Sequence, residues 1–226
     1  MTDTLTLVLE TSTPQGSLST IEPDGRMEHR EFTSDRSHNA VLFSPLQELL
    51  DARETSQIGL VLVGSGPGSY SGTRVGIAAA QGVAIASGCP AVALPSILAV
   101  PCAQAGARCL AIGDARRGSF WTAAIDGSRL LAEPQLTDAT GLLEIVATAL
   151  TNAVPVFSFE TSDRFPLPPE IQTQVHLEFP NAQRLWLAWS AATPETRELW
   201  TFASPQPMYL KPPHITPAKR PWLVQP

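Results

Sequence analysis

The chain has 226 residues, of which 43% are hydrophobic and only 16% are charged, and its formal net charge at pH 7 is −6. This length allows one large domain or two small ones, and the hydrophobic share is ample for a buried core. Proteins that bind nucleic acid tightly by themselves usually carry a basic stripe, but the 15 basic residues here are scattered, so direct tight binding of RNA or DNA is not expected.

The first half of the chain alternates between strand-like and helix-like segments. The pattern predicts strands at 4–11, 16–21 and 26–32, a helix at 38–52, a strand at 58–63, a helix at 75–87, a strand at 91–94 and a helix at 97–104. Short turns join the first three strands, which predicts an antiparallel meander. Pro45 lies inside the first helix and predicts a kink or a late helix start.

The second half repeats this beginning. The pattern predicts strands at 109–114 and 119–125, a hairpin turn at Asp126-Gly127, a helix at 142–150, a strand at 154–159, a helix at 182–192 and an extended proline-rich tail at 205–226. Residues 160–182 hold many prolines and show little periodicity. Each half opens with a strand hairpin around an acidic residue, Glu10 or Asp114. This predicts a duplicated α/β architecture, which we divide into residues 1–104 and 105–226.

The most informative stretch is residues 58–76, IGLVLVGSGPGSYSGTRVG. A β-branched strand is followed by a glycine-rich turn and a helix start, an arrangement that points backbone N–H groups and the positive end of a helix dipole at an anion. The stretch lacks the lysine of a phosphate-binding Walker loop and the third glycine of a dinucleotide fingerprint. A tight turn that needs glycine for close packing explains the same residues equally well. The candidate anion-binding residues are Gly66, Gly68, Ser69 and Gly72.

Asp114 and the two arginines that follow it form a second candidate contact for an anion. Two guanidinium groups on a turn can hold an anion in a bidentate fashion, so Asp114 and Arg116 join the candidate site. A surface ion pair around a hairpin is the alternative.

Two helices offer apolar or small residues at helical spacing and are the candidate partner interface. The residues singled out are Leu42, Leu46, Leu49, Gly76, Ala79, Ala80 and Val83.

The three cysteines lack metal-ligand spacing, which predicts free thiols in a reducing compartment. The N-terminus has no basic region followed by a long apolar run, so no export signal is expected. The apolar stretch 75–112 is broken by Pro90, Pro95 and Pro101, so no membrane span is expected. These features predict a cytoplasmic protein.

Several segments together resemble the bacterial TsaB (YeaZ) proteins, relatives of the glycoprotease-like TsaD group in the actin-like, sugar-kinase and Hsp70 (ASKHA) fold class. The matching segments are LVLETST at 7–13, SHN at 37–39, GPGSYSGTRVGIAAAQGVA at 66–84, GDARRGSFW at 113–121 and PMYLK at 207–211. The resemblance implies an α/β fold of the ASKHA class, with two similar subdomains that each contain a mixed sheet.

The resemblance also implies a role in making N6-threonylcarbamoyladenosine at position 37 of tRNA. In that scheme a TsaD-type protein transfers the threonylcarbamoyl group and needs TsaB and a TsaE-type ATPase. TsaB is then a scaffold and activator without catalytic residues. It contacts TsaD through helices of its N-terminal half, forms homodimers through a similar face and meets tRNA only through the complex. No cofactor is expected, with weak binding of ATP or ADP as the alternative.

The residues themselves agree with a non-catalytic role. The TsaD group holds a metal with two histidines four residues apart on one helix, but here His38 is followed four residues later by Leu42. We therefore expect no metal site and a local packing or capping role for His38. Glu10 stands where many relatives have aspartate, and we expect it to be structural. The rivals are an active enzyme of the same fold, either an ATP-dependent transferase or a metallo-glycoprotease, and a partner-free nucleotide-binding homodimer.

Overall fold

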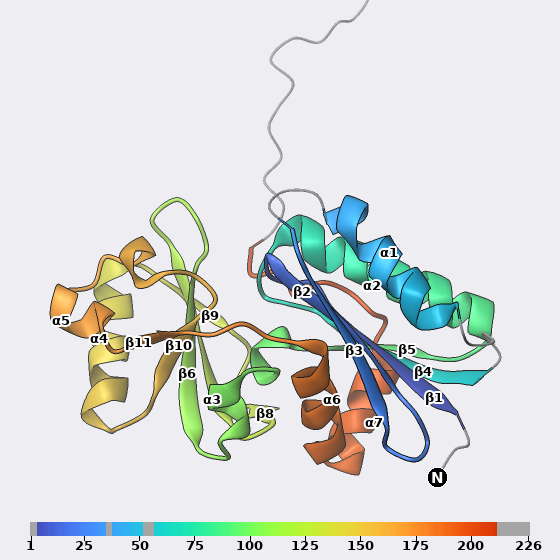
Figure 1. Cartoon of the computed structure of the whole chain (residues 1–226). Coiled ribbons are helices and arrows are strands. Elements are labelled where there is room, and N and C mark those ends of the chain that lie inside the picture. Colours follow the sequence, from blue (N-terminus) through green and yellow to red (C-terminus); the bar gives the residue numbers. More distant parts are fainter. Residues whose placement is uncertain (1–3, 35–37, 52–56, 212–226) are drawn as a thin grey trace, which may run out of the picture.

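The computed structural model describes residues 4–34, 38–51 and 57–211 and contains two mixed sheets that lie side by side (Figure 1). The first sheet has the strand order β3-β2-β1-β4-β5. Its strands are β1 (Leu5–Glu10), β2 (Gln15–Ile21), β3 (Met27–Thr33), β4 (Ile58–Gly64) and β5 (Ala91–Leu94). β1, β2 and β3 pair in antiparallel fashion, while β4 is parallel to both β1 and β5, which confirms the predicted meander.

The second sheet has the order β11-β10-β6-β7-β8, and β9 also pairs with β7. Its strands are β6 (Arg108–Asp114), β7 (Phe120–Asp126), β8 (Arg129–Leu130), β9 (Gln135–Thr137), β10 (Val156–Ser158) and β11 (Val175–Leu177). The hairpin predicted at Asp126-Gly127 is confirmed, because Asp126 pairs with Arg129 and Gly127 has a positive φ. The pairing of β6 with β10, and of β10 with β11, is parallel.

Both halves follow the same path, which confirms the predicted architecture of two similar α/β subdomains. Each has an antiparallel hairpin, a third antiparallel strand, a helix, a parallel strand, a second helix and a last parallel strand. The helices of the first half are α1 (His38–Leu50) and α2 (Tyr70–Ser87), and those of the second are α4 (Ala139–Thr151) and α5 (Pro169–Gln172). Successive side chains of a strand point to opposite faces, so the consecutive buried residues of β1 and β6 let each sheet bury both faces.

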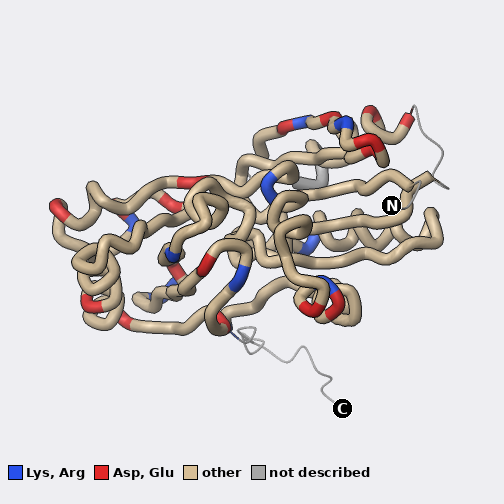
Figure 2. The backbone as a smooth tube through the Cα atoms, turned by 90° about the horizontal axis from the view of Figure 1, so that it is seen from below, with Lys and Arg blue, Asp and Glu red and all other residues tan. Residues whose placement is uncertain are grey.

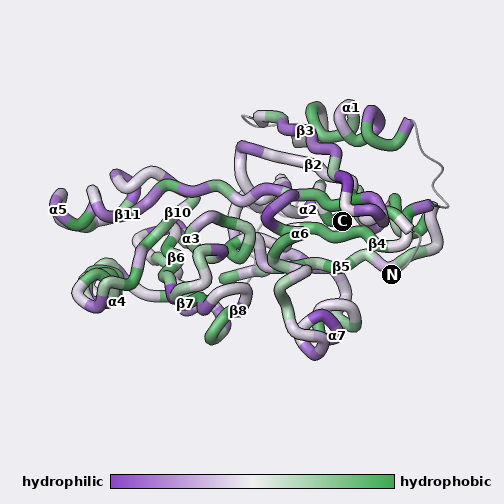
Figure 3. The backbone as a smooth tube through the Cα atoms, turned by 60° about the horizontal axis from the view of Figure 1, so that its bottom comes forward, coloured by the Kyte–Doolittle hydropathy of each residue, from purple (hydrophilic) through white to green (hydrophobic). Residues whose placement is uncertain are grey.

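Helices cover both faces of the first sheet. Leu7 and Leu9 point into a core with α1 and α2, whereas Val8 and Leu62 point into a second core with Leu185 of α6 (Ala182–Ala191). α7 (Pro194–Phe202) follows α6 and lies beside β5 (Figure 1). The hydrophilic edge strand β3 contrasts with the hydrophobic β4, an interior strand of the sheet (Figure 3).

The chain crosses between the halves more than once. α6 and α7 come after the last strand of the second sheet but pack on the first sheet, so both sheets share core residues. The division after residue 104 stays a prediction, and α7 is an element that the sequence analysis missed. Thr193 and Pro194 form an N-cap and first-turn signal that marks its start.

Two sequence predictions about individual elements were wrong, and one stretch contains elements for which no prediction was made. The helix expected at 97–104 is two short pieces, η2 (Ser96–Leu98) and α3 (Pro101–Gln104), because Pro101 has no N–H to continue the first piece and starts the second. The late start of the first helix is also wrong, since α1 begins at His38 and runs through Pro45. The irregular stretch 160–182 contains η3 (Ser162–Arg164), α5 and β11.

The described tail, residues 205–211, has no regular secondary structure, and the rest of the predicted extended tail lies outside the described residues. No helix in the described ranges combines the length and apolar character that crossing a membrane would need.

Replacement by alanine is expected to have opposite effects on stability at two glycines of α2. A methyl group on Gly76 would collide with Thr11 Oγ1, whereas no atom lies within 4 Å of the place where one on Gly82 would stand. We expect Gly76→Ala to lower the free energy of unfolding by about 1–3 kcal/mol through overpacking. We expect Gly82→Ala to raise it by about 0.5–1 kcal/mol, because alanine loses less backbone entropy in a helix. Urea denaturation measures both, and equal effects would contradict the packing described for Thr11.

Candidate functional site

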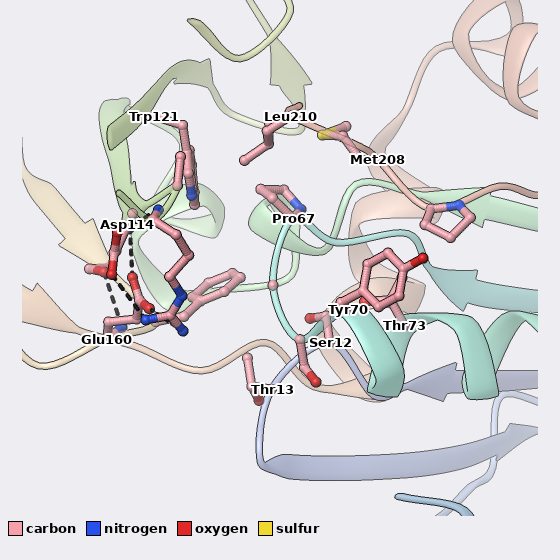
Figure 4. Close-up of a pocket in the computed structure, with 18 of the residues that line it drawn as sticks. Ser12, Thr13, Pro67, Tyr70, Thr73, Asp114, Trp121, Glu160, Met208 and Leu210 are labelled. Carbon is pink, nitrogen blue, oxygen red and sulfur yellow. Dashed lines mark hydrogen bonds and ion pairs between the residues drawn. The ribbon is translucent and has the colours of Figure 1, made fainter. Parts of the chain in front are cut away.

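The main cleft of about 830 Å³ lies between the two halves, at the carboxyl ends of β1, β4, β6 and β10. Ser12 and Pro67 contribute from the first half, and Asp114, Trp121 and Glu160 contribute from the second (Figure 4). Ligands of open α/β sheets bind at this edge, and the volume falls in the usual range for small-molecule sites. The cleft is therefore the candidate binding site.

The glycine-rich turn forms the wall on the side of the first half, and most of its amides already have partners. Ser65 N–H donates to Leu94 O (2.7 Å), Gly66 N–H to Ser96 Oγ (3.0 Å) and Ser69 N–H to Ser12 O (2.6 Å). A methyl group on Gly68 would collide with Ser12 O, so glycine is required there for close approach. Ser69 caps α2 by accepting from Gly72 N–H.

Of the four loop residues that were predicted to bind an anion, two line the cleft and two do not. Gly68 and Ser69 line the cleft, while Gly66 and Gly72 do not. The bonds that hold Ser65, Gly66 and Ser69 are those of a close-packed turn, which is the alternative that the sequence left open. Anion binding at this loop stays a prediction.

Charged side chains gather on the wall from the second half. Arg116 Nη1 donates to Asp114 Oδ2 (3.0 Å), and Arg116 Nη2 lies 3.9 Å from Glu160 Oε1. The backbone joins the same cluster, because Asp114 N–H donates to Glu160 Oε2 (2.7 Å) and Arg116 N–H donates to Asp114 Oδ1 (2.6 Å). Arg116 forms the hairpin ion pair that was the alternative to anion binding. An anion would have to compete with two carboxylates for this guanidinium.

Glu10 lies at the end of β1, as Asp114 does at the end of β6, but its surroundings differ. Its side chain is 0% exposed and does not line the cleft. Oε1 accepts from Ser12 N–H (2.7 Å), and Oε2 has no hydrogen-bond partner among the described residues. Burial raises the pKa of Glu10 above its ordinary value of 4.5, and the hydrogen bond from Ser12 N–H offsets this only in part. Glu10 therefore holds the strand end and its following turn together.

Sequence reasoning missed several residues of the cleft, above all Trp121, Glu160 and Ser12. Trp121 is in the quoted segment GDARRGSFW, but it was not singled out. The available signal was positional, since polar residues that follow parallel strands meet at one edge of a sheet. Glu160 follows β10, and Ser12 follows β1.

Most of the predicted partner interface is core, including Leu46 (6% exposed) and Ala79 (9% exposed), which also line a groove. Leu42, Leu49, Gly76 and Ala80 are buried within this chain, so these four were wrong as contact residues, and a charge at Ala80 would test folding instead of binding. Leu46, Ala79 and Val83 line an apolar groove of about 600 Å³ between α1 and α2. The remaining lining residues are Phe43, Arg74, Val75, Ala78 and Gly82.

Charges and potential metal ligands are dispersed. Basic and acidic positions alternate over both halves of the described chain (Figure 2). Within residues 4–34, 38–51 and 57–211, no three His, Cys, Asp or Glu side chains come together as metal ligands would. The side chain of His38, for which packing or capping was predicted, lies outside the described part. Cys89, Cys102 and Cys109 are free thiols, as predicted.

Comparison with known proteins places these features in a family context. Residues 31–152, just over half of the chain, match the model of the TsaD family, described as tRNA N6-adenosine threonylcarbamoyltransferase. The tRNA threonylcarbamoyladenosine biosynthesis protein TsaB of Escherichia coli (strain K12) is 29% identical over 122 residues, which is 51% of this chain and 52% of that protein. The match thus spans about half the length of this relative.

Two solved structures from Pseudomonas aeruginosa share the fold. One is a protein with similarity to the peptidase YeaZ (TM-score 0.68, 22% identity), and the other is YeaZ (TM-score 0.66, 23% identity). Each alignment covers 92% of this chain and 100% of the other. These findings confirm the resemblance and the fold class expected from the sequence.

The buried carboxyl group of Glu10 predicts a pH dependence of stability. Because the folded pKa is raised, the folded state keeps its proton where the unfolded state has lost it, so stability falls as pH rises from about 4.5 through the folded pKa. Glu10→Gln keeps an acceptor for Ser12 N–H and cannot ionise. We expect it to flatten this decline and to be more stable than the wild type at pH 8.

Urea titrations between pH 4 and pH 9 provide the measurement. Glu133→Gln, at an exposed glutamate, is the matched control and should follow the wild-type curve. Parallel curves for Glu10→Gln and the wild type would show that Glu10 titrates alike in both states.

Proposed function

The chain belongs to the TsaD family, tRNA N6-adenosine threonylcarbamoyltransferase, and on that premise we propose that it is a non-catalytic subunit for threonylcarbamoylation of adenosine 37 in tRNA. It binds a TsaD-type transferase and supports its activity. The E. coli relative, named as a threonylcarbamoyladenosine biosynthesis protein, supports this reaction.

The groove between α1 and α2 is the observation that carries the proposal. Its lining is apolar apart from Arg74, and Phe43 at its edge is 54% exposed. Small residues on α2, such as Ala78 and Gly82, let a helix of a partner approach closely, while Phe43 offers a large apolar contact. Exposed apolar surface of this kind marks an interaction site. The groove therefore suits a helix from the transferase, or from a second copy of this chain in a homodimer.

The cleft wall that is formed by the first half of the chain supports the proposal of a subunit that has no catalytic site. Glu10 is buried beneath the turn and accepts a hydrogen bond from Ser12 N–H. It cannot touch a ligand in the cleft without rearrangement of that turn. The glycine loop likewise uses its amides within the fold.

The remaining partners follow from the same role. A TsaE-type ATPase acts on the complex, and tRNA is met through the complex, in line with a charge distribution that gathers no basic stripe in the described residues (Figure 2). The cytoplasm is the proposed location, because the tRNA substrate and free thiols such as Cys89 suit it.

A partner-free nucleotide-binding protein is the second candidate, and the cleft of about 830 Å³ favours it. Calorimetric titration of the isolated chain with ATP and ADP tests it. Binding that disappears in Trp121→Ala, on the cleft wall, would place the nucleotide there, and the absence of heat at millimolar nucleotide would remove this candidate.

A charge in the groove should prevent assembly with the transferase. Ala78 lines the groove and is exposed, whereas Ala86 is exposed on the same helix outside it. We expect Ala78→Glu to weaken the mixed complex by at least about tenfold (about 1.4 kcal/mol), since a partner helix would have to remove the new carboxylate from water, and its attraction to Arg74, one turn away, does not repay that cost. We expect Ala86→Glu, with the same added charge, to bind like the wild type. Size-exclusion chromatography with light scattering and calorimetry with the TsaD-type protein of the same organism measure this.

Either of two results would count against the proposal. Separate peaks for the two wild-type proteins, even with ATP and the TsaE-type protein present, would remove the subunit role. Equal binding by Ala78→Glu would leave the role standing but place the interface elsewhere.

A further inference from the structure

Residues 207–211, PMYLK, run along the cleft after α7 has ended, and all five line it. This segment is far in the sequence from both walls, and Figure 4 places Leu210 between Trp121 and Met208, above Pro67. We call residues 207–211 the tail segment. Its earlier residues contact the first half of the molecule, and its last two contact the second half.

The first contact of the tail segment is with the turn after β4. Met208 N–H donates to Ser65 O at 2.8 Å. Next to it, the ring of Tyr209 lies 5.9 Å from that of Tyr70, the first residue of α2. One backbone bond and one ring contact therefore fix the segment to the first half.

The second contact is with the other half. Leu210 packs against the apolar cluster that includes Ala111, Trp121 and Phe157. Lys211 Nζ donates to Arg116 O at 3.1 Å, on the hairpin between β6 and β7. The same hairpin carries the ion pair of Arg116 with Asp114.

The short distance along the chain between these contacts limits how far the halves can separate. Three residues of extended chain span at most about 10 Å. While the contacts of Met208 and Lys211 persist, the segment between them therefore limits the separation of the two cleft walls. The chain otherwise crosses between the sheets at residues 95–107 and 178–181, outside the strands, where short connections permit a hinge. Opening of the cleft therefore requires that the contacts at one end of the tail segment break.

We propose that the tail segment is a clasp that ties the two halves together across the cleft, and that its release lets the cleft widen. The clasp is built from one backbone bond, one ring contact, one apolar side chain and one lysine, so few contacts have to be displaced to release it. This inference does not depend on the proposed function, because it concerns contacts within one chain.

The test measures the distance between the halves in the full chain. Spin labels on ketone-bearing residues introduced at Gln81 of α2 and Glu144 of α4, both exposed, leave the native cysteines untouched. Double electron–electron resonance then compares the wild type with Leu210→Asp, which puts a charge against the apolar cluster. Gln206→Asp adds the same charge just before the clasp, at an exposed position, and is the matched control.

We expect Leu210→Asp to shift the distance distribution to longer and broader values and Gln206→Asp to leave it unchanged. An unchanged distribution in folded Leu210→Asp would overturn the clasp. Circular dichroism reports folding, and should Leu210→Asp unfold, Lys211→Met decides the question, since it removes only the bond to Arg116 O. A distribution like that of the wild type in Lys211→Met would then overturn the proposal.

Discussion

The direct contact between the first hairpin and the β4–α2 junction is the constraint on which the rest of the structure depends. Gly68 lies against Ser12 O, Ser69 N–H donates to that same oxygen, and Thr11 Oγ1 donates to Gly72 O at 2.9 Å. Side chains at the glycines would push β1 and α2 apart. This contact fixes where α2 begins, which sets one wall of the cleft and also the face that α2 presents beside α1.

The duplicated halves use the same path for different purposes. At the end of the first strand, the first half has a buried carboxyl group that supports its own turn, whereas the second half has a carboxylate in the cleft, paired with Arg116. The polar chemistry of the cleft thus comes mainly from the second half.

The two surfaces of interest are separated in space and in composition. The groove between α1 and α2 is apolar and belongs to the first half alone, while the cleft is mixed in polarity and is shared by both halves. The tail segment contacts only the cleft. The groove and the cleft are therefore separate surfaces, although α2 contributes to both through Val83 and Tyr70.

The sequence by itself determined most elements, because strand alternation, turn residues and the glycine junction are local signals: the meander, the hairpin at Asp126-Gly127 and the duplication were all predicted. It also identified Gly68, Ser69, Asp114 and Arg116, four residues that line one cleft. Only the tertiary structure decided which buried apolar residues also line a groove, because Leu42 and Leu46 share one stripe and are both core, yet only Leu46 reaches the groove. It also decided that Glu10 is buried, that Arg116 is paired and that residues 207–211 cross the cleft, since these outcomes depend on contacts between residues far apart in the chain.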